Sequence, residues 1–265
     1  MYSTNYHRPS SLGEAAELMK TGDAKYVAGG QTLIPAMRLR LAAPSDLIDL
    51  AHIEGMTGIE VSADTVMIRA GTTHAEVAQS ERLRAVCPAI CDLAALVGDP
   101  QVRHKGTIGG SIANNDPAAD YPAALLALGA TVTTNQRRIP ADEFFTGLFE
   151  TALEEDEIVT AVTFALPEKA GYEKFRNPAS RFALTGVFVA KGKDGVRVAV
   201  TGAGDEGVFR ADEVEAALAK NFDPSALAGV TVPSANLMTD IHASADYRAS
   251  LIVVMAKRAV MKANA

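Results

Sequence analysis

Apolar and polar positions follow two different rhythms along this chain. In residues 12–19 the apolar positions recur with a helical period, and Ser11 stands three residues before a glutamate, the spacing of a capping box. Short apolar runs at 26–28 and 46–50 are typical of strands, and residues 33–41 have the apolar spacing of a short helix. The first 50 residues or so are therefore predicted to alternate strand and helix.

From about Gly55 onward, strand patterns become more frequent. Asp120 is a good N-cap, the proline that follows its neighbour suits a first helical turn, and Gly129 is suited to end that helix. A longer helical stretch is interrupted at Pro88. The predicted elements are strands at 59–61, 66–70, 130–134 and 158–164, and helices at 73–91 and from 120 to 129.

The last third of the sequence has the pattern of a smaller α+β unit. Residues 167–171 are the best linker candidate. Two apolar runs, 182–191 and 196–202, are joined by a short segment ending in Asp-Gly, which favours an antiparallel hairpin. Helices are predicted at 212–220 and 246–262. The predicted class is mixed α/β, with a second α+β unit from about residue 170.

Composition narrows the functional classes. The chain has 265 residues, with 25 basic and 32 acidic side chains, so its formal charge is −7. A pI near 5.3 argues against a footprint for nucleic acid or anionic lipid. The apolar run 251–256 is far too short for a membrane span, and the N-terminus shows no signal peptide. Two cysteines cannot form a disulfide framework, so a reduced, cytoplasmic compartment is expected.

A first glycine motif, Ala28-Gly29-Gly30-Gln31-Thr32-Leu33, lies between a predicted strand and helix. Two glycines permit unusual backbone angles and leave no Cβ to block a ligand. The amides of Gln31, Thr32 and Leu33 would then point outward as donors for an anion such as phosphate. The motif is neither a Walker loop nor G-x-G-x-x-G, and taken alone it is better explained as a tight turn.

A second motif is more informative. Residues 105–120 collect three glycines, a threonine, a serine and two asparagines around few branched apolar residues. The hydroxyls of Thr107 and Ser111 and the amide of Gly110 could bind a second phosphate. The Asp120 carboxylate could accept hydrogen bonds from both hydroxyls of a ribose. Asp120 and Asp116 could instead be helix caps. Two separate anion sites suit a pyrophosphate, and hence a dinucleotide.

The remaining titratable residues are expected to have structural roles and not to form a metal site. The five histidines have no metal-ligand spacing, and Cys87 and Cys91, four residues apart, are expected to be buried packing residues. The acidic run 154–157 is predicted to be a solvated turn, and Arg137 and Arg138 to be surface residues.

With these motifs the sequence resembles the FAD-binding medium subunit of the molybdenum hydroxylases, of the carbon monoxide dehydrogenase and xanthine dehydrogenase type. The resemblance extends over essentially the whole chain. It is carried by the stretches Val27–Arg40, Thr107–Ser111 and Asp116–Asp120, together with Tyr6–Pro9, Gln101–Arg103, Asp156–Val159, Lys174-Phe175 and Asp240–Arg248.

This resemblance implies a fold. It is the vanillyl-alcohol-oxidase/PCMH-like FAD-binding fold, in two α/β subdomains at about 1–54 and 55–168, followed by a C-terminal α+β domain at 171–265 with an antiparallel sheet.

The resemblance also implies residue roles. The two glycine motifs would wrap the FAD pyrophosphate, Asn114 would lie near the flavin, and Asp120 would hold the adenosine ribose. Lys174 would lie near the flavin pyrimidine, and Phe182 would lie against the isoalloxazine. The implied FAD-binding residues are Ala28, Gly29, Gly30, Gln31, Thr32, Leu33, Thr107, Gly109, Gly110, Ser111, Asn114, Asp120, Lys174 and Phe182.

Two segments depart from the pattern of the family. The chain has Asn114-Asn115 where relatives often have a histidine–alanine pair, and the loop 176–181 has its own sequence. Both departures could alter the flavin potential or access of the electron acceptor.

The implied function is that of an electron-transfer subunit that has no catalytic residue or metal of its own. Electrons would come from [2Fe-2S] clusters on a small partner subunit, after substrate oxidation at a molybdenum cofactor on a large partner subunit. They would leave FAD for NAD, a quinone or oxygen, and the assembly would be a dimer of heterotrimers. A self-contained flavin oxidase or dehydrogenase and a non-catalytic nucleotide-binding module remain alternatives. The sequence does not indicate the substrate of the complex.

Overall fold

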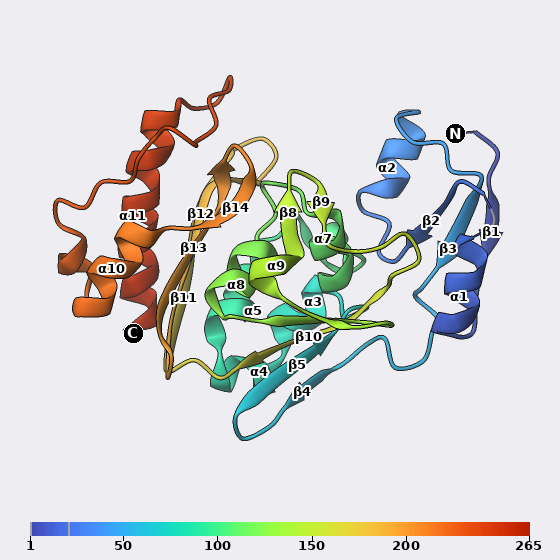
Figure 1. Cartoon of the computed structure of the whole chain (residues 1–265), viewed down its shortest axis with the longest axis horizontal. Coiled ribbons are helices and arrows are strands. Elements are labelled where there is room, and N and C mark those ends of the chain that lie inside the picture. The colour runs from blue at the N-terminus through green and yellow to red at the C-terminus, as the bar shows by residue number, and fades with distance from the viewer. Residues whose placement is uncertain (1, 21) are drawn as a thin grey trace.

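The computed structural model describes residues 2–20 and 22–265, and in it the chain builds three sheet-containing units in a row (Figure 1). The N-terminal unit lies at one end of the molecule, a central unit follows, and a third unit with the long helix α11 (Ala245–Ala263) lies at the other end. Because neighbouring units are in contact, loops that are distant in sequence can share one site.

The N-terminal unit is a parallel sheet of strand order β1-β3-β2, with Leu47 of the central strand paired to Tyr6 on one side and Lys25 on the other. The predicted cap is confirmed, since the Ser11 side chain accepts from the Glu14 amide. The predicted strands and helices are confirmed to within a few residues. The elements are β1 (Asn5–His7), α1 (Leu12–Met19), β2 (Ala24–Val27), α2 (Leu33–Arg38) and β3 (Asp46–Asp49).

The central unit is built on an antiparallel sheet of order β4-β5-β10-β6-β7. Its strands are β4 (Ile59–Val61), β5 (Thr65–Arg69), β6 (Thr131–Thr134), β7 (Arg138–Pro140) and β10 (Val159–Ala165), and a small hairpin adds β8 (Phe145–Gly147) and β9 (Glu150–Thr151). Its helices are α3 (His74–Gln79), α4 (Glu81–Val86), α5 (Pro88–Ala95), α6 (Pro100–Arg103), α7 (Ile108–Asn114), α8 (Tyr121–Ala127) and α9 (Ala141–Phe144).

The helical stretch predicted at 73–91 is broken at Ser80 as well as at Pro88. Ser80 has extended backbone angles, and its side chain accepts from the Leu83 amide, so it starts a new helix. The sequence did not predict the break at Ser80, because the spacing of the apolar residues around it is also compatible with a continuous helix.

The third unit is a four-stranded antiparallel sheet of order β11-β12-β13-β14, covered by helices. The hairpin between β12 and β13 is confirmed, with Gly192 paired to Gly195 across its turn. The elements are β11 (Lys169–Arg176), β12 (Ala183–Gly192), β13 (Gly195–Gly204), β14 (Gly207–Arg210), α10 (Asp212–Lys220), the 3-10 turn η1 (Pro224–Leu227) and α11.

The linker predicted at 167–171 is wrong in its second half, because β11 already begins at Lys169. Gly171 lies in this strand directly against α11, where a Cβ would come within 2.0 Å of the Ala259 carbonyl oxygen. A proline and a glycine so close together resemble a linker in sequence, although here the glycine allows a helix to lie close to a strand.

One expectation about charged residues also needs correction. Glu157, predicted to lie in a solvated turn, is 3% exposed, and it accepts hydrogen bonds from Arg137 and Thr134. Arg137 is itself exposed, as predicted, and its ion pair with Glu157 lowers the pKa of that carboxyl to about 2. The prediction that Cys87 and Cys91 are buried is confirmed.

Helix α8 lies at the centre of the molecule, and all seven of its residues are buried. It belongs to the central unit but packs against β12 and β13 of the third unit. The hydroxyl of Thr201 on β13 donates to the carbonyls of Pro117 and Ala119 just before α8, which ties the two units together. In the part of the chain that the structure describes, no helix has the length and apolar character needed to cross a bilayer.

We expect Gly171→Ala to destabilise the protein by about 1–3 kcal/mol, because the added methyl group would force β11 away from α11. Urea unfolding followed by circular dichroism measures this change. Gly192→Ala is the matched control, since a Cβ there meets nothing within 4 Å, and we expect it to shift stability by less than about 0.5 kcal/mol. Equal behaviour of the two variants would contradict the close strand–helix contact.

Candidate functional site

The two glycine motifs touch each other in the folded chain. A Cβ on Gly29, in the loop between β2 and α2, would lie 2.1 Å from the Lys105 carbonyl oxygen and 2.7 Å from the Gly106 Cα. No side chain fits into that space, so glycine is required there. Gly30 is needed for a different reason, because its φ of +67° lies in the left-handed region. The contact brings together loops that are more than seventy residues apart in sequence.

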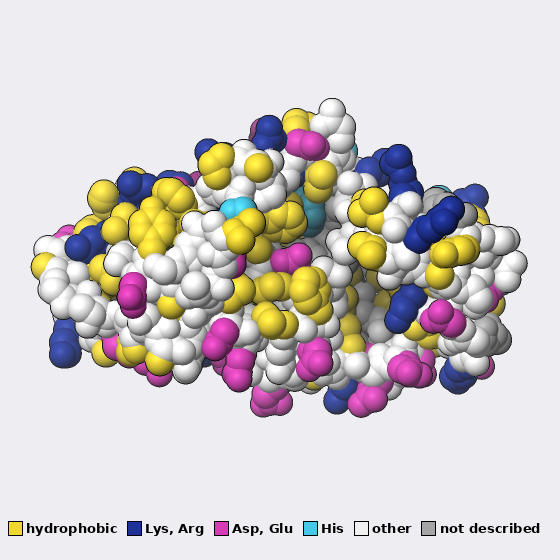
Figure 2. All heavy atoms as spheres, turned by 90° about the horizontal axis from the view of Figure 1, so that it is seen from above, with side chains coloured by type: hydrophobic (Ala, Val, Ile, Leu, Met, Phe, Trp, Pro, Cys, Tyr) yellow, Lys and Arg dark blue, Asp and Glu magenta, His cyan; other side chains and the backbone are white. Residues whose placement is uncertain are grey.

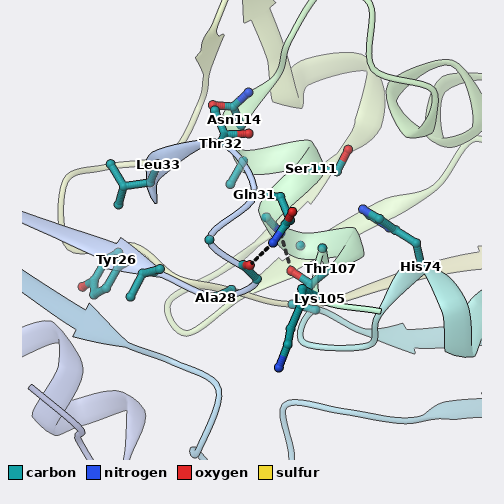
Figure 3. A pocket seen from close by; sticks show the side chains of 18 of the residues that line it. Tyr26, Ala28, Gln31, Thr32, Leu33, His74, Lys105, Thr107, Ser111 and Asn114 are labelled. Atoms are coloured by element: carbon teal, nitrogen blue, oxygen red, sulfur yellow. Dashed lines mark hydrogen bonds between the residues drawn. The ribbon is translucent and has the colours of Figure 1, made fainter. Parts of the chain in front are cut away.

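The first loop presents free backbone donors. Within the described residues, the N–H groups of Gln31, Thr32 and Leu33 donate to no other group of the chain. The Gln31 side chain folds back, and its Nε2 donates to the Gly29 carbonyl at 3.1 Å, which steadies the turn (Figure 3). Three adjacent unpaired amides at a strand–helix turn form the kind of concave donor set that holds an anion.

The second motif forms the start of helix α7 rather than an open loop. The Thr107 hydroxyl caps this helix by accepting from the Gly110 amide at 3.1 Å, so this amide already has a partner within the chain. Gly109 is required by packing, since a Cβ there would lie 2.5 Å from the Ala70 Cβ. The glycines that appeared in sequence to be ligand contacts thus also fit α7 tightly onto the end of β5.

A single large cavity is lined by residues from all three units. Its volume is about 1410 Å³, above the range of roughly 300–1,000 Å³ usual for small-molecule sites. Figure 2 looks onto the hollowed surface between the N-terminal and central units. The structure places all fourteen residues implied by the resemblance in its wall. Among them, Phe182 is 50% exposed, in the loop between β11 and β12.

Asp120 is the centre of a buried polar cluster in this wall. It is 5% exposed, and its carboxylate accepts from Tyr172 and, at 2.9 Å, from the Nζ of Lys174. Both donors lie on β11 in the third unit. Burial raises the pKa of the Asp120 carboxyl, and the positive charge of Lys174 opposes that rise. The cluster joins the central and third units at the cavity.

This contact corrects two sequence-based expectations. Asp120 makes no side-chain cap to α8, because its oxygens are directed to Tyr172 and Lys174 instead. In addition, Asp120 was assigned to the adenosine ribose and Lys174 to the flavin pyrimidine, which are opposite ends of FAD. Since the two side chains form an ion pair, they cannot take those two separate roles.

The structure adds wall residues that the sequence did not single out. These include His74 beside the second motif, and Asp49 and His52 at the end of β3, while Lys105 and Gly106 at the start of the second motif also line the cavity. Asp49 accepts from the hydroxyl of Tyr6, which holds it in place. The sequence could have predicted a role for Asp49 and His52, because they follow a parallel strand and ligands commonly bind at the carboxyl ends of such strands.

Residues 2–167 match the family described as FAD binding domain in molybdopterin dehydrogenase. The chain is 35% identical to the carbon monoxide dehydrogenase medium chain of Hydrogenophaga pseudoflava, over 96% of this chain and 95% of that protein. It is 34% identical to the nicotine 6-hydroxylase medium subunit of Paenarthrobacter nicotinovorans, over 98% and 97% of the two chains.

The chain is also similar to a solved structure. The fold is similar to a chain of the carbon monoxide dehydrogenase from Hydrogenophaga pseudoflava that lacks the Mo-pyranopterin moiety of the molybdenum cofactor. The TM-score is 0.87 at 34% sequence identity, and the match covers 99% of this chain and 97% of that chain. The similarity therefore extends over the third unit as well as over the part matched by the family.

We expect Lys174→Met to destabilise the chain by about 3–5 kcal/mol, because it leaves the buried Asp120 carboxylate without its positive partner. Adding Asp120→Asn to this variant removes the unpaired charge and should restore part of the loss. Urea unfolding of the two single variants and the double variant measures the coupling. The control is Lys20→Met, which breaks an exposed pair with Glu17. Strict additivity of the two changes would contradict the ion pair.

Stability should fall in weak acid because of His74. Burial, and to a smaller extent the charge of Arg103, lower the pKa of His74 from 6.5 to about 4. The unfolded chain therefore binds a proton more readily between these values, and stability is lost as pH falls from about 6.5 toward 4, by up to roughly 3 kcal/mol. We expect His74→Phe to flatten this part of the profile, measured by urea unfolding at successive pH values. An unchanged slope would contradict the assignment.

Proposed function

Because the chain belongs to the family of FAD-binding domains in molybdopterin dehydrogenases, we propose that it binds FAD in the large cavity and serves as the electron-transfer subunit of a heteromeric molybdenum hydroxylase. The observation that carries the proposal is the contact of Gly29 with residues 105–106, which brings two glycine-rich motifs to one cavity. FAD, when bound, accepts electrons and passes them on, and the protein supplies its placement and surroundings.

The residues present fit this cofactor. The unpaired amides of Gln31, Thr32 and Leu33 would donate to the pyrophosphate, and the hydroxyls of Thr107 and Ser111 would approach it from the second motif. Lys174 and Asp120, which are in contact, would lie together near the flavin, as would Asn114 and Phe182. The cavity volume of about 1410 Å³ suits a dinucleotide better than a mononucleotide.

The domains follow from the same reasoning. We propose an FAD-binding domain at 1–168, in subdomains of about 1–54 and 55–168, and a C-terminal domain at 171–265. The separate sheets of the three units support these boundaries, and the position of β11 puts the last boundary just before Lys169.

The partners follow from the family. The two relatives are named as a medium chain and a medium subunit, and this chain matches nearly their whole length. The chain works with a large subunit that holds the molybdenum cofactor and a small subunit that holds [2Fe-2S] clusters. We further propose a dimer of heterotrimers in the cytoplasm, with NAD, a quinone or oxygen as the final acceptor.

Purification with native partners tests this function. We expect a yellow-brown complex that contains FAD, molybdenum and iron, and whose substrate-dependent dye reduction is lost when this chain is omitted. Two other outcomes would overturn it. A single chain whose flavin is bleached directly by a small alcohol would indicate a self-contained oxidase, and nucleotide affinity without any redox activity would indicate a binding module.

We expect Gly29→Ala to lower FAD affinity by about 10-fold or more, because the methyl group would force the two motifs apart by more than an ångström at the pyrophosphate. Isothermal titration of the full chain stripped of FAD measures the affinity. Gly13→Ala is the matched control, since a Cβ on that α1 residue meets nothing within 4 Å. Full FAD affinity in Gly29→Ala would contradict the proposed site.

A further inference from the structure

His74 is held against the second glycine motif by the backbone. It is the first residue of α3, and its N–H donates to the Gly106 carbonyl at 2.9 Å. The preceding residue, Thr73, forms an antiparallel bridge with Thr107. The Thr73–Glu76 capping box fixes the start of α3, so the position of the imidazole is determined by two connected turns.

The imidazole itself is almost completely enclosed. The residue is 4% exposed, and its ring lies against Tyr121, with 5.4 Å between the ring centroids. A Cβ on Gly106 would come within 2.7 Å of the His74 Nε2, so the lack of a side chain at Gly106 makes room for the ring. Figure 3 shows the imidazole pointing from α3 toward the segment that carries Thr107 and Ser111.

Neither ring nitrogen has a partner among the described residues. Nδ1 is fully buried without a hydrogen bond, and Nε2 lies at Gly106 in the cavity wall. Nε2 is therefore the ring nitrogen that can meet a ligand, because it lies at the cavity wall and no described residue of the chain binds it. A neutral imidazole carries one N–H, and an anion in the cavity would favour the tautomer with that proton on Nε2.

We propose that His74 is a cofactor-binding residue whose Nε2–H donates a hydrogen bond to the pyrophosphate of the bound dinucleotide. The inference rests on the proposed function, since it assigns a further contact to the same FAD. It adds a side-chain donor on the side of the second motif, where the Gly110 amide is already used by the Thr107 cap. A histidine that only fills space beside Tyr121 would make no such contact.

Two variants separate these possibilities in the full chain stripped of FAD. His74→Phe keeps a ring to pack on Tyr121 but removes the donor, and His74→Gln keeps a donor without the ring. We expect His74→Phe to weaken FAD and ADP alike by about 10-fold or more, as for a lost hydrogen bond to a charged group. We expect His74→Gln to stay within about threefold of the wild type.

Isothermal titration with FAD and with ADP gives the affinities, and thermal melting of each variant without ligand checks the fold. His242→Phe is the control, because that histidine is exposed in the third unit and does not line the cavity. Should His74→Phe not fold, His74→Met, which has similar length and no donor, replaces it in the comparison with His74→Gln.

The outcomes distinguish a failure of the proposed FAD-binding function from a failure of the His74 assignment alone. If the wild-type chain takes up no FAD, the proposed function itself fails. If the wild type binds FAD and the donor-free variant binds FAD and ADP equally tightly, only the assignment of His74 is overturned. An equal loss of affinity in the donor-free variant and in His74→Gln would also overturn it, since ring shape would then be the cause.

Discussion

The contact between Gly29 and the Lys105–Gly106 backbone is the constraint on which the site depends. The N-terminal unit and the central unit have separate sheets, and this contact brings their glycine-rich motifs together. A side chain at position 29 would separate the two loops, and the unpaired amides of residues 31–33 would then face water instead of a shared cavity. The local backbone conformation and the shape of the site therefore have the same cause.

A second, quite different interaction completes the cavity wall. The Asp120 carboxylate lies before α8 and binds two donors from β11, so a buried ion pair fixes how the third unit meets the central one. Such a pair is costly to bury, and it is tolerated because both carboxylate oxygens have partners. Neither Cys87 nor Cys91 lines this cavity, and burial raises the pKa of Cys87 to about 12 and of Cys91 to about 11.

Most elements of the fold could be predicted from local sequence patterns. The Ser11 cap, the β12–β13 hairpin and the end of α8 at Gly129 were predictable because each depends on a few neighbouring residues. The errors arose where a tertiary contact decided the outcome. The sequence of residues 169–171 resembles a linker, and only the approach of α11 explains a glycine within a strand there.

For the candidate site, too, local features could be predicted from the sequence, and tertiary contacts could not. All fourteen residues implied by the resemblance line the cavity. Those in the two glycine motifs could be found because glycine-rich turns and small polar residues are visible in sequence, whereas Lys174 and Phe182 came from the resemblance alone. The sequence could not show that Asp120 and Lys174 are paired, since they belong to different units and nothing local links them. His74 was also missed, because its proposed role depends on the position of its Nε2 at the cavity wall and not on any spacing between histidines.

Hydrogen exchange of the full chain with and without FAD tests the central claim most directly, because it reports each segment separately. The account predicts that amides in residues 28–33 and 105–111 gain protection together, with the same dependence on FAD concentration. Protection of one segment alone, or of neither while FAD is bound, would contradict the idea that the two motifs hold a single dinucleotide.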